Sequence, residues 1–186
     1  MLSFQLTEFP VLVTERMVLR PLRASDAGPM FTMRSDQRVM EHVNRPMART
    51  VEDAVALIEL INARIAAQES LHWALTVKGE DAFIGLIGLW RLVKEDHLGE
   101  LGYTLMQPYW GMGYASEAIA AVAEYGFRTM GLHRIEAITR PQNRASIRVL
   151  EKNGFVREGY FKQNVFWNGA FHDSVLFGRL AGPTSP

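Results

Sequence analysis

The sequence predicts one α/β domain, residues 1–186, with about four helices on a mixed, mostly antiparallel sheet of seven strands. Three observations lead to this fold class. Runs in which apolar residues recur at helical spacing alternate along the chain with shorter strand-like runs. Three neighbouring strand-like runs are joined by short polar links, which favours an antiparallel meander. The chain has 186 residues, of which 48% are hydrophobic and 22% charged, as in a soluble globular domain.

The first half of the chain is expected to form one strand, two helices and the three-strand meander. Thr50 and Asp53 match a capping box, and apolar residues follow them at helical spacing. The stretch "AFIGLIGLW" is apolar on both faces, as in a central strand. The expected strands are 15–22, 71–77, 82–90 and 99–106, and the expected helices are 27–34 and 51–67.

The second half is expected to alternate helix and strand and to end in a hairpin. Gly154 suits the left-handed residue that ends a helix. Asn168-Gly169 lies between two strand-like runs, which is a strong signal for a tight hairpin turn. The expected helices are 113–128 and 143–153, and the expected strands are 133–139, 155–167 and 170–180.

Composition excludes several classes of function. Lysine plus arginine equals aspartate plus glutamate, 20 each, so no electrostatic footprint for nucleic acid or an anionic membrane is present. The chain has no cysteine, which excludes disulfides, thiolate metal sites and a cysteine nucleophile. The five histidines show no metal-ligand spacing, so no metal site is expected. Neither a signal-peptide pattern nor a bilayer-spanning apolar run occurs, and a cytoplasmic location is expected.

The stretch "QPYWGMGYASEAIAAVAEYGF" places Gly111 and Gly113 directly before an amphipathic helix. Free N–H groups and the helix dipole favour an anion at such a helix start, and glycines let a phosphate approach the backbone. A second interpretation is that the glycines only permit a tight strand-to-helix turn. The Walker lysine is absent and position 116 is serine instead of a third glycine, which argues against an ATPase or a dinucleotide-binding regulatory domain.

Two stretches, "LGYTLMQPYWGMGYASEAIAAV" and "HRIEAITRPQNRASIRVLEKNGFVREGYF", resemble the GNAT acyltransferases. The most similar branch contains the ribosomal-protein serine/alanine N-terminal acetyltransferases. The resemblance implies a sheet that splays between its fourth and fifth strands, 99–106 and 133–139, with the pantetheine arm of acetyl-CoA in the gap. It also implies a primary amine as acceptor, either a protein N-terminus or a small molecule, and allows a homodimer.

The resemblance implies a set of cofactor-binding residues around the glycine loop and at the start of the helix 143–153. Pro108 departs from the family pattern, which has glutamine or arginine at that position. The implied cofactor-binding residues are Leu105, Met106, Gln107, Trp110, Gly111, Met112, Gly113, Tyr114, Ala115, Ser116, Asn143 and Ser146.

The resemblance further implies direct attack of an amine on the acetyl thioester, with Glu100 as the base and Ser146 as the acid. Glu100 has an alternative role as an ion-paired strand residue, and Ser146 as a residue that bonds only to the backbone of its helix. Leu150 stands where many relatives have an acidic tyrosine, and Val165 where the ribosomal-protein branch has a glutamate. Both departures leave open an acyl-CoA-binding module with little or no catalysis.

Overall fold

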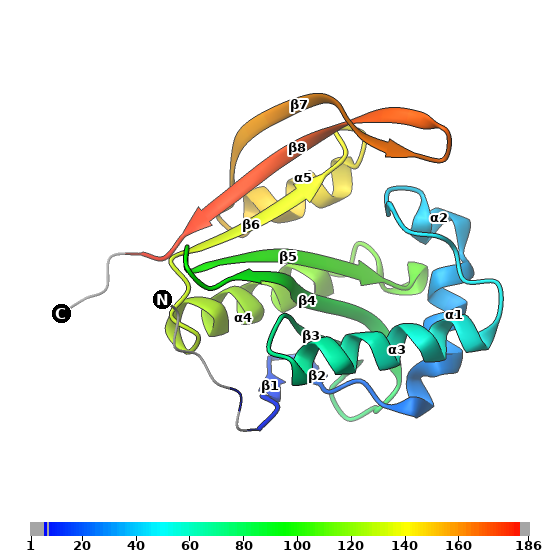
Figure 1. Ribbon diagram of the computed structural model, residues 1–186. Helices are drawn as coiled ribbons and strands as arrows, with labels where there is room; N and C mark the ends of the chain where they lie inside the picture. The colour runs from blue at the N-terminus through cyan, green and yellow to red at the C-terminus, as the bar shows by residue number, and fades with distance from the viewer. Residues whose placement is uncertain (1–5, 7, 183–186) are drawn as a thin grey trace.

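The computed structural model describes residue 6 and residues 8–182, and its sheet has eight strands in the order β1-β2-β3-β4-β5-β6-β8-β7. All neighbouring strands pair antiparallel except β5 and β6, which are parallel. Figure 1 shows α1 and α3 on one face of the sheet and α4 and α5 on the other. The predicted mixed α/β fold is therefore confirmed.

The elements have the following bounds. The strands are β1 Leu12–Val13, β2 Met17–Arg20, β3 Leu71–Val77, β4 Phe83–Val93, β5 Leu98–Leu105, β6 Arg134–Thr139, β7 Val156–Trp167 and β8 Ala170–Leu180. The α-helices are α1 Ala27–Ser35, α2 Gln37–Met40, α3 Val51–Ala66, α4 Tyr114–Arg128 and α5 Arg144–Lys152. Two short 3₁₀ helices cover Ala24–Asp26 and Gln107–Tyr109.

Two short elements were not predicted. The strand count of seven was wrong by one, because β1 contributes only two residues, which pair with β2 and are too few to show alternation. The helix α2 has four residues and is held by Asp36, whose side chain accepts from the N–H of Arg38 at 2.9 Å. One helical turn leaves no periodic pattern in a sequence.

The predicted local signals have the expected geometry. The Thr50–Asp53 capping box is formed at the start of α3. Asn168 and Gly169 have φ values of 48° and 77°, the left-handed pair that a two-residue hairpin turn requires. Gly154 ends α5 with φ 77°. These turns are encoded by neighbouring residues and do not depend on the rest of the fold.

The sheet separates into two wings at β5 and β6. These strands pair only at Leu98, Gly99 and Glu100, opposite residues 134–136. Beyond that point β5 continues to pair with β4, and β6 with β8. In Figure 1 the two strands diverge toward the side where the glycine loop lies. The predicted splay is confirmed, and it exposes the facing edges of both strands.

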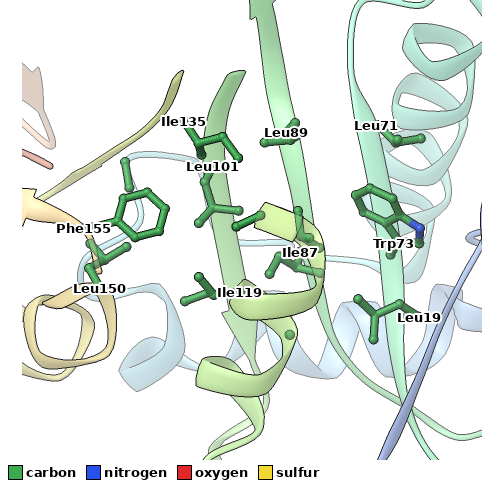
Figure 2. Close-up of a cluster of buried hydrophobic side chains, with 14 of the residues drawn as sticks. Leu19, Leu71, Trp73, Ile87, Leu89, Leu101, Ile119, Ile135, Leu150 and Phe155 are labelled. Carbon is green, nitrogen blue, oxygen red and sulfur yellow. The ribbon is translucent and has the colours of Figure 1, made fainter. Parts of the chain in front are cut away.

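The larger hydrophobic core holds α4 against the sheet. Figure 2 shows Ile119 of α4 beside Ile87 and Leu101 on the strands, and all three side chains are buried. Each such side chain contributes about 1.5–3 kcal/mol by leaving water. A second core lies between α1, α3 and the opposite face of the sheet. Because α4 is fixed by its buried face, the loop at its N-terminus is held at the open end of the splay.

Candidate active site

The glycine loop presents an open helix N-terminus. Gly111 and Gly113 have φ values of 74° and 86°, which side-chain-bearing residues rarely adopt. Gly113 is the N-cap of α4, and no side-chain hydrogen bond caps this helix. The first N–H groups of α4 therefore point out of the loop with the positive end of the helix dipole behind them. This geometry suits a phosphate.

Arg16, just before β2, holds the loop from outside. Its Nη1 donates to the Met112 carbonyl at 2.8 Å, and its Nε donates to Glu117 at 2.7 Å. Its guanidinium also lies 4.8 Å from the ring centre of Tyr114. Since Glu117 neutralises Arg16, the arginine acts as a brace for the loop. Arg16 was not predicted from the sequence, because the contacts join segments 96 and 101 residues apart.

Trp110 and Met106 connect the loop to the end of β5. The Trp110 indole N–H donates to the Leu105 carbonyl at 2.9 Å, and the Met106 N–H donates to Ile84 on β4 at 2.9 Å. Antiparallel strands alternate the side to which peptide groups point. The N–H and C=O groups of Leu105 and Tyr103 therefore point away from β4, toward the gap. The N–H of Leu105 faces this open edge.

The helices α4 and α5 are tied together beside the gap. Asn153 donates to the Ser116 hydroxyl at 3.0 Å and to the Val149 carbonyl at 2.8 Å. At the other end of α5, the Asn143 side chain caps the helix by accepting from the Ser146 N–H at 3.1 Å. Asn143 and Ser146 therefore lie together at the start of α5, while Ser116 lies one turn into α4.

Ser146 contacts Tyr103 across the gap. The two hydroxyl oxygens are 2.7 Å apart, and Tyr103 comes from β5 after its pairing with β6 has ended. Burial raises the pKa of Tyr103 to about 12, so the phenol keeps its proton at neutral pH. Tyr103 was not predicted as a site residue. It alternates along β5 with the buried residues Leu101 and Leu105, a pattern that indicates only packing against the core.

Glu100 lies at the closed end of the splay, where β5 still pairs with β6. Its side chain is 7% exposed, and Arg91 Nε lies 3.1 Å from its carboxylate. Burial raises the pKa of Glu100, Arg91 opposes this rise, and the facing Glu136 adds to it. Glu100 and Tyr103 are three positions apart on β5, so the two side chains project from opposite faces of the strand. Glu100 therefore does not contact the pair formed by Tyr103 and Ser146.

The two apolar departures lie in different surroundings. Leu150 is 1% exposed and belongs to the larger core, where a hydroxyl would have to be buried. Val165 lies on β7 opposite His172, near the hairpin turn. Pro108, the third departure from the family pattern, lies within the 3₁₀ helix Gln107–Tyr109. Its missing N–H is tolerated there because the first residues of a helix have no intrahelical acceptor.

A hollow of about 460 Å³ opens beyond the end of β6. It is lined from three directions, by the segment after α2, the segment after β6 and the β7–β8 hairpin. Arg140 is fixed there by donating to Asn44 at 2.6 and 3.2 Å. Asp173 accepts from the N–H of Gln163 at 2.8 Å, which stabilises a bulge where Gln163 has φ 52°. The lining residues are Glu41, His42, Arg140, Gln142, Gln163, Phe171, His172 and Asp173.

Known proteins share this arrangement over most of the chain. Residues 16–156 match the family described as an acetyltransferase (GNAT) domain. The uncharacterized N-acetyltransferase YoaA of Bacillus subtilis is 32% identical over 91% of this chain and 96% of its own length. The [ribosomal protein uS5]-alanine N-acetyltransferase of Escherichia coli is 28% identical over 89% of this chain and 88% of its own length.

The fold of this chain is also similar to that of a solved structure. Mycobacterium smegmatis RimJ, in complex with CoA-disulfide, superposes with a TM-score of 0.82 at 25% identity, covering 95% of this chain and 89% of that chain. No helix in the described part of the present chain is long and apolar enough to cross a membrane. The glycine loop, the splayed strands and these similarities together identify the family. The chain belongs to the GNAT acetyltransferases, and its relatives include the ribosomal-protein alanine N-acetyltransferases.

Proposed function

We propose that the protein transfers an acetyl group from acetyl-CoA to a primary amine by direct attack in a ternary complex. The observation that carries this proposal is the open N-terminus of α4, which lies at the wide end of the β5–β6 splay. The first feature suits a diphosphate, and the second leaves room for an extended arm. RimJ of M. smegmatis, which has a similar fold and 25% identity, binds CoA.

In this proposal the loop from Trp110 to Ser116 holds the diphosphate of acetyl-CoA through its main-chain N–H groups. The pantetheine arm then follows the free edge of β5. The N–H of Leu105 is the donor for the arm or for the acetyl carbonyl, since its own carbonyl is already bonded to Trp110. A single N–H aimed at the developing oxyanion contributes about 3 kcal/mol to catalysis.

The amine must lose a proton before it attacks. A free alkyl amine has a pKa near ~10.4 and is mostly protonated at neutral pH. Glu100 is the proposed base, because burial raises its pKa toward the range useful for proton transfer. Its carboxylate lies on the face of β5 opposite Tyr103, so a water molecule must relay the proton. Ser146 is the proposed hydrogen-bond donor to the departing sulfur, because it lies beside the gap at the start of α5.

The hollow beyond β6 is the proposed acceptor site. It adjoins the loop that leads to Asn143 and Ser146, and its rim includes Glu41 and Asp173, whose carboxylates favour an approaching ammonium group. The acceptor is either a protein N-terminus, as for the uS5-alanine enzyme of E. coli, or a small-molecule amine. A cytoplasmic location and a homodimer stay predictions from the sequence, and sizing chromatography of the purified chain tests the second.

An acetyl-CoA turnover screen tests the proposal. The purified protein is assayed against peptides beginning with serine or alanine, polyamines, aminoglycosides and amino acids, with free thiol release as the signal. Glu100→Gln and Ser146→Ala should each lower turnover by about 10²-fold and leave acetyl-CoA affinity nearly unchanged. Glu124→Gln, an exposed glutamate on α4, is the matched control and should behave like the wild type.

Two outcomes would contradict the proposal. Tight binding of acetyl-CoA without acetylation of any amine would favour a binding module, for which the apolar residues Leu150 and Val165 would then be the explanation. Binding of ATP or NAD but not of CoA would favour a nucleotide-binding regulatory domain.

A further inference from the structure

The proposed reaction assigns no role to Tyr103, whose side chain contacts Ser146 at the gap. It lies three residues beyond Glu100, where β5 has lost β6 as a neighbour. Its hydroxyl reaches from β5 to the start of α5 and lies 2.7 Å from Ser146 Oγ. The same hydroxyl lies 3.5 Å from the Ser146 carbonyl oxygen. The contact thus joins the two elements that border the gap.

Ser146 is held in place by its neighbours. Its N–H donates to the Asn143 side chain at 3.1 Å, which leaves its hydroxyl as the group free to turn. When Tyr103 donates to Ser146 Oγ, the serine proton is directed away from the phenol and toward a third atom. A hydroxyl that accepts one hydrogen bond also becomes a better donor of its own.

We infer that Tyr103 is a positioning residue that orients the Ser146 hydroxyl toward the sulfur of the acetyl donor. This inference rests on the proposed function. In the transfer step the C–N bond forms, the C–S bond breaks and its electron pair goes to sulfur. Ser146 donates a hydrogen bond to that developing thiolate. The acceptor nitrogen loses two protons overall: the first leaves the ammonium before attack and passes through water to Glu100, and the second leaves the nitrogen as the amide forms and neutralises the thiolate through water.

Tyr103 does not itself supply that proton. Its phenol has a pKa of about 12, whereas an ordinary thiol has a pKa near ~8.5. Proton transfer from Tyr103 to the thiolate is therefore unfavourable by roughly a thousandfold. Either hydroxyl can donate across the 2.7 Å contact, and the inferred role requires the phenol to be the donor to Ser146 Oγ throughout the reaction.

The experiment compares Tyr103→Phe, Ser146→Ala and the double variant with the wild type. Tyr103→Phe removes only the hydroxyl and keeps the ring that packs against the larger core. We expect kcat to fall about tenfold, with the KM values for acetyl-CoA and amine within about twofold of wild type. In the Ser146→Ala background, Tyr103→Phe should cause no further loss, because the group it orients is gone.

A second readout does not require turnover. The ultraviolet absorbance of the CoA thiolate, followed against pH, reports the pKa of the thiol when CoA is bound. A hydrogen bond from Ser146 to sulfur lowers that pKa, so Tyr103→Phe should raise it, and the affinity for desulfo-CoA should not change. Tyr125→Phe is the matched control. Tyr125 is a partly buried tyrosine near the C-terminal end of α4, and its ring packs against Trp73 of β3.

The outcomes separate this inference from the proposed function. An unchanged bound-thiol pKa in Tyr103→Phe, or a loss that adds fully to that of Ser146→Ala, would overturn the inference even if the wild type acetylates amines. A wild type without turnover would contradict the proposed function, while the thiol titration would still decide the role of Tyr103. If Tyr103→Phe does not fold, the thiol titration of Ser146→Ala decides. An unchanged pKa of the bound thiol in that variant would show that Ser146 does not bond to the sulfur, which would overturn the inference.

Discussion

The two sides of the gap are built in different ways. The glycine loop uses main-chain groups from one short segment, residues 107–116, ahead of a helix that the core holds rigidly. The hollow beyond β6 uses side chains from three separate segments, including the carboxylates of Glu41 and Asp173 and the guanidinium of Arg140. We call these regions the donor side and the acceptor side.

The difference concerns what each side can recognise. Peptide N–H groups and a helix dipole suit any diphosphate, so the donor side is general for its ligand. Side-chain contacts depend on the residue type at each position, so the acceptor side can differ between proteins with the same fold. Changes on the donor side should therefore affect acetyl-CoA alone, and changes on the acceptor side should affect the amine alone.

The largest effect is expected from Gly113→Val. The backbone at Gly113 is left-handed, with φ +86°, a conformation that valine rarely adopts. The Cβ of a side chain there would also lie 3.1 Å from Arg16 Nη2. Acetyl-CoA affinity should fall on the order of 100-fold, measured by calorimetry. Gly79→Val is the matched control, because Gly79 has φ +87° in open space at the β3–β4 turn. Equal loss of affinity in both variants would show that unfolding, and not the loop, is responsible.

A smaller effect on the same side is expected from Arg16→Ala. This change removes the side-chain bonds to Met112 and Glu117, keeps the bond from the main-chain N–H of residue 16 to Glu117, and leaves every main-chain donor of the loop in place. Acetyl-CoA affinity should weaken about tenfold, since the loop loses its brace but keeps its ligand groups. Arg128→Ala, which removes an exposed partner of Glu124 at the other end of α4, is the control. If Arg16→Ala instead changes the KM of the amine alone, the division into two sides is wrong.

The same division explains what could be predicted from the sequence. The glycines at 111 and 113, the Thr50–Asp53 capping box and the Asn168-Gly169 turn were predicted because each depends on residues a few positions apart. The family resemblance added the splay between β5 and β6. Arg16 was missed, because its role comes from contacts that only the folded chain creates.

The chemistry of the site was less predictable than its backbone. The sequence indicated Glu100 and Ser146, but not that Glu100 would lie buried beside Arg91 or that Ser146 would contact Tyr103. The acceptor side was less predictable still, because its residues come from three separate segments of the chain. One of its walls depends on the β7–β8 bulge, where residues 162–164 lie opposite the single residue Asp173 of β8 and no short turn motif marks the irregularity.

On the acceptor side, Arg140→Ala should raise the KM of the amine about fivefold and leave acetyl-CoA affinity unchanged. Arg140 anchors Asn44 and thereby the segment that carries Glu41 and His42. Arg148→Ala, an exposed arginine on α5, is the control. Steady-state kinetics with each substrate varied in turn makes the measurement. A weaker affinity for acetyl-CoA with an unchanged amine KM would place the hollow on the donor side.

The smallest effect on either substrate is expected from His72→Phe, which changes the framework shared by both sides. The ring of His72 lies close against Gly88 on β4, and its Nδ1 is buried without a hydrogen bond among the described residues. Burial lowers the pKa of His72 from 6.5 to about 4. Its neutral form is favoured by the fold, so stability is fully present above about pH 6.5 and declines as pH falls toward 4, by at most about 3 kcal/mol.

Phenylalanine keeps a flat ring at position 72 and cannot take up a proton, so the variant should lose less stability than the wild type between pH 6.5 and 4. Urea unfolding at both pH values measures this difference, and a constant offset from an imperfect fit of the larger ring cancels in it. Both substrate affinities at neutral pH should stay within about twofold of wild type. An unchanged acid sensitivity would show that His72 is not the buried group whose protonation weakens the fold. A change in one affinity alone would mean that the framework does not support the donor and acceptor sides equally.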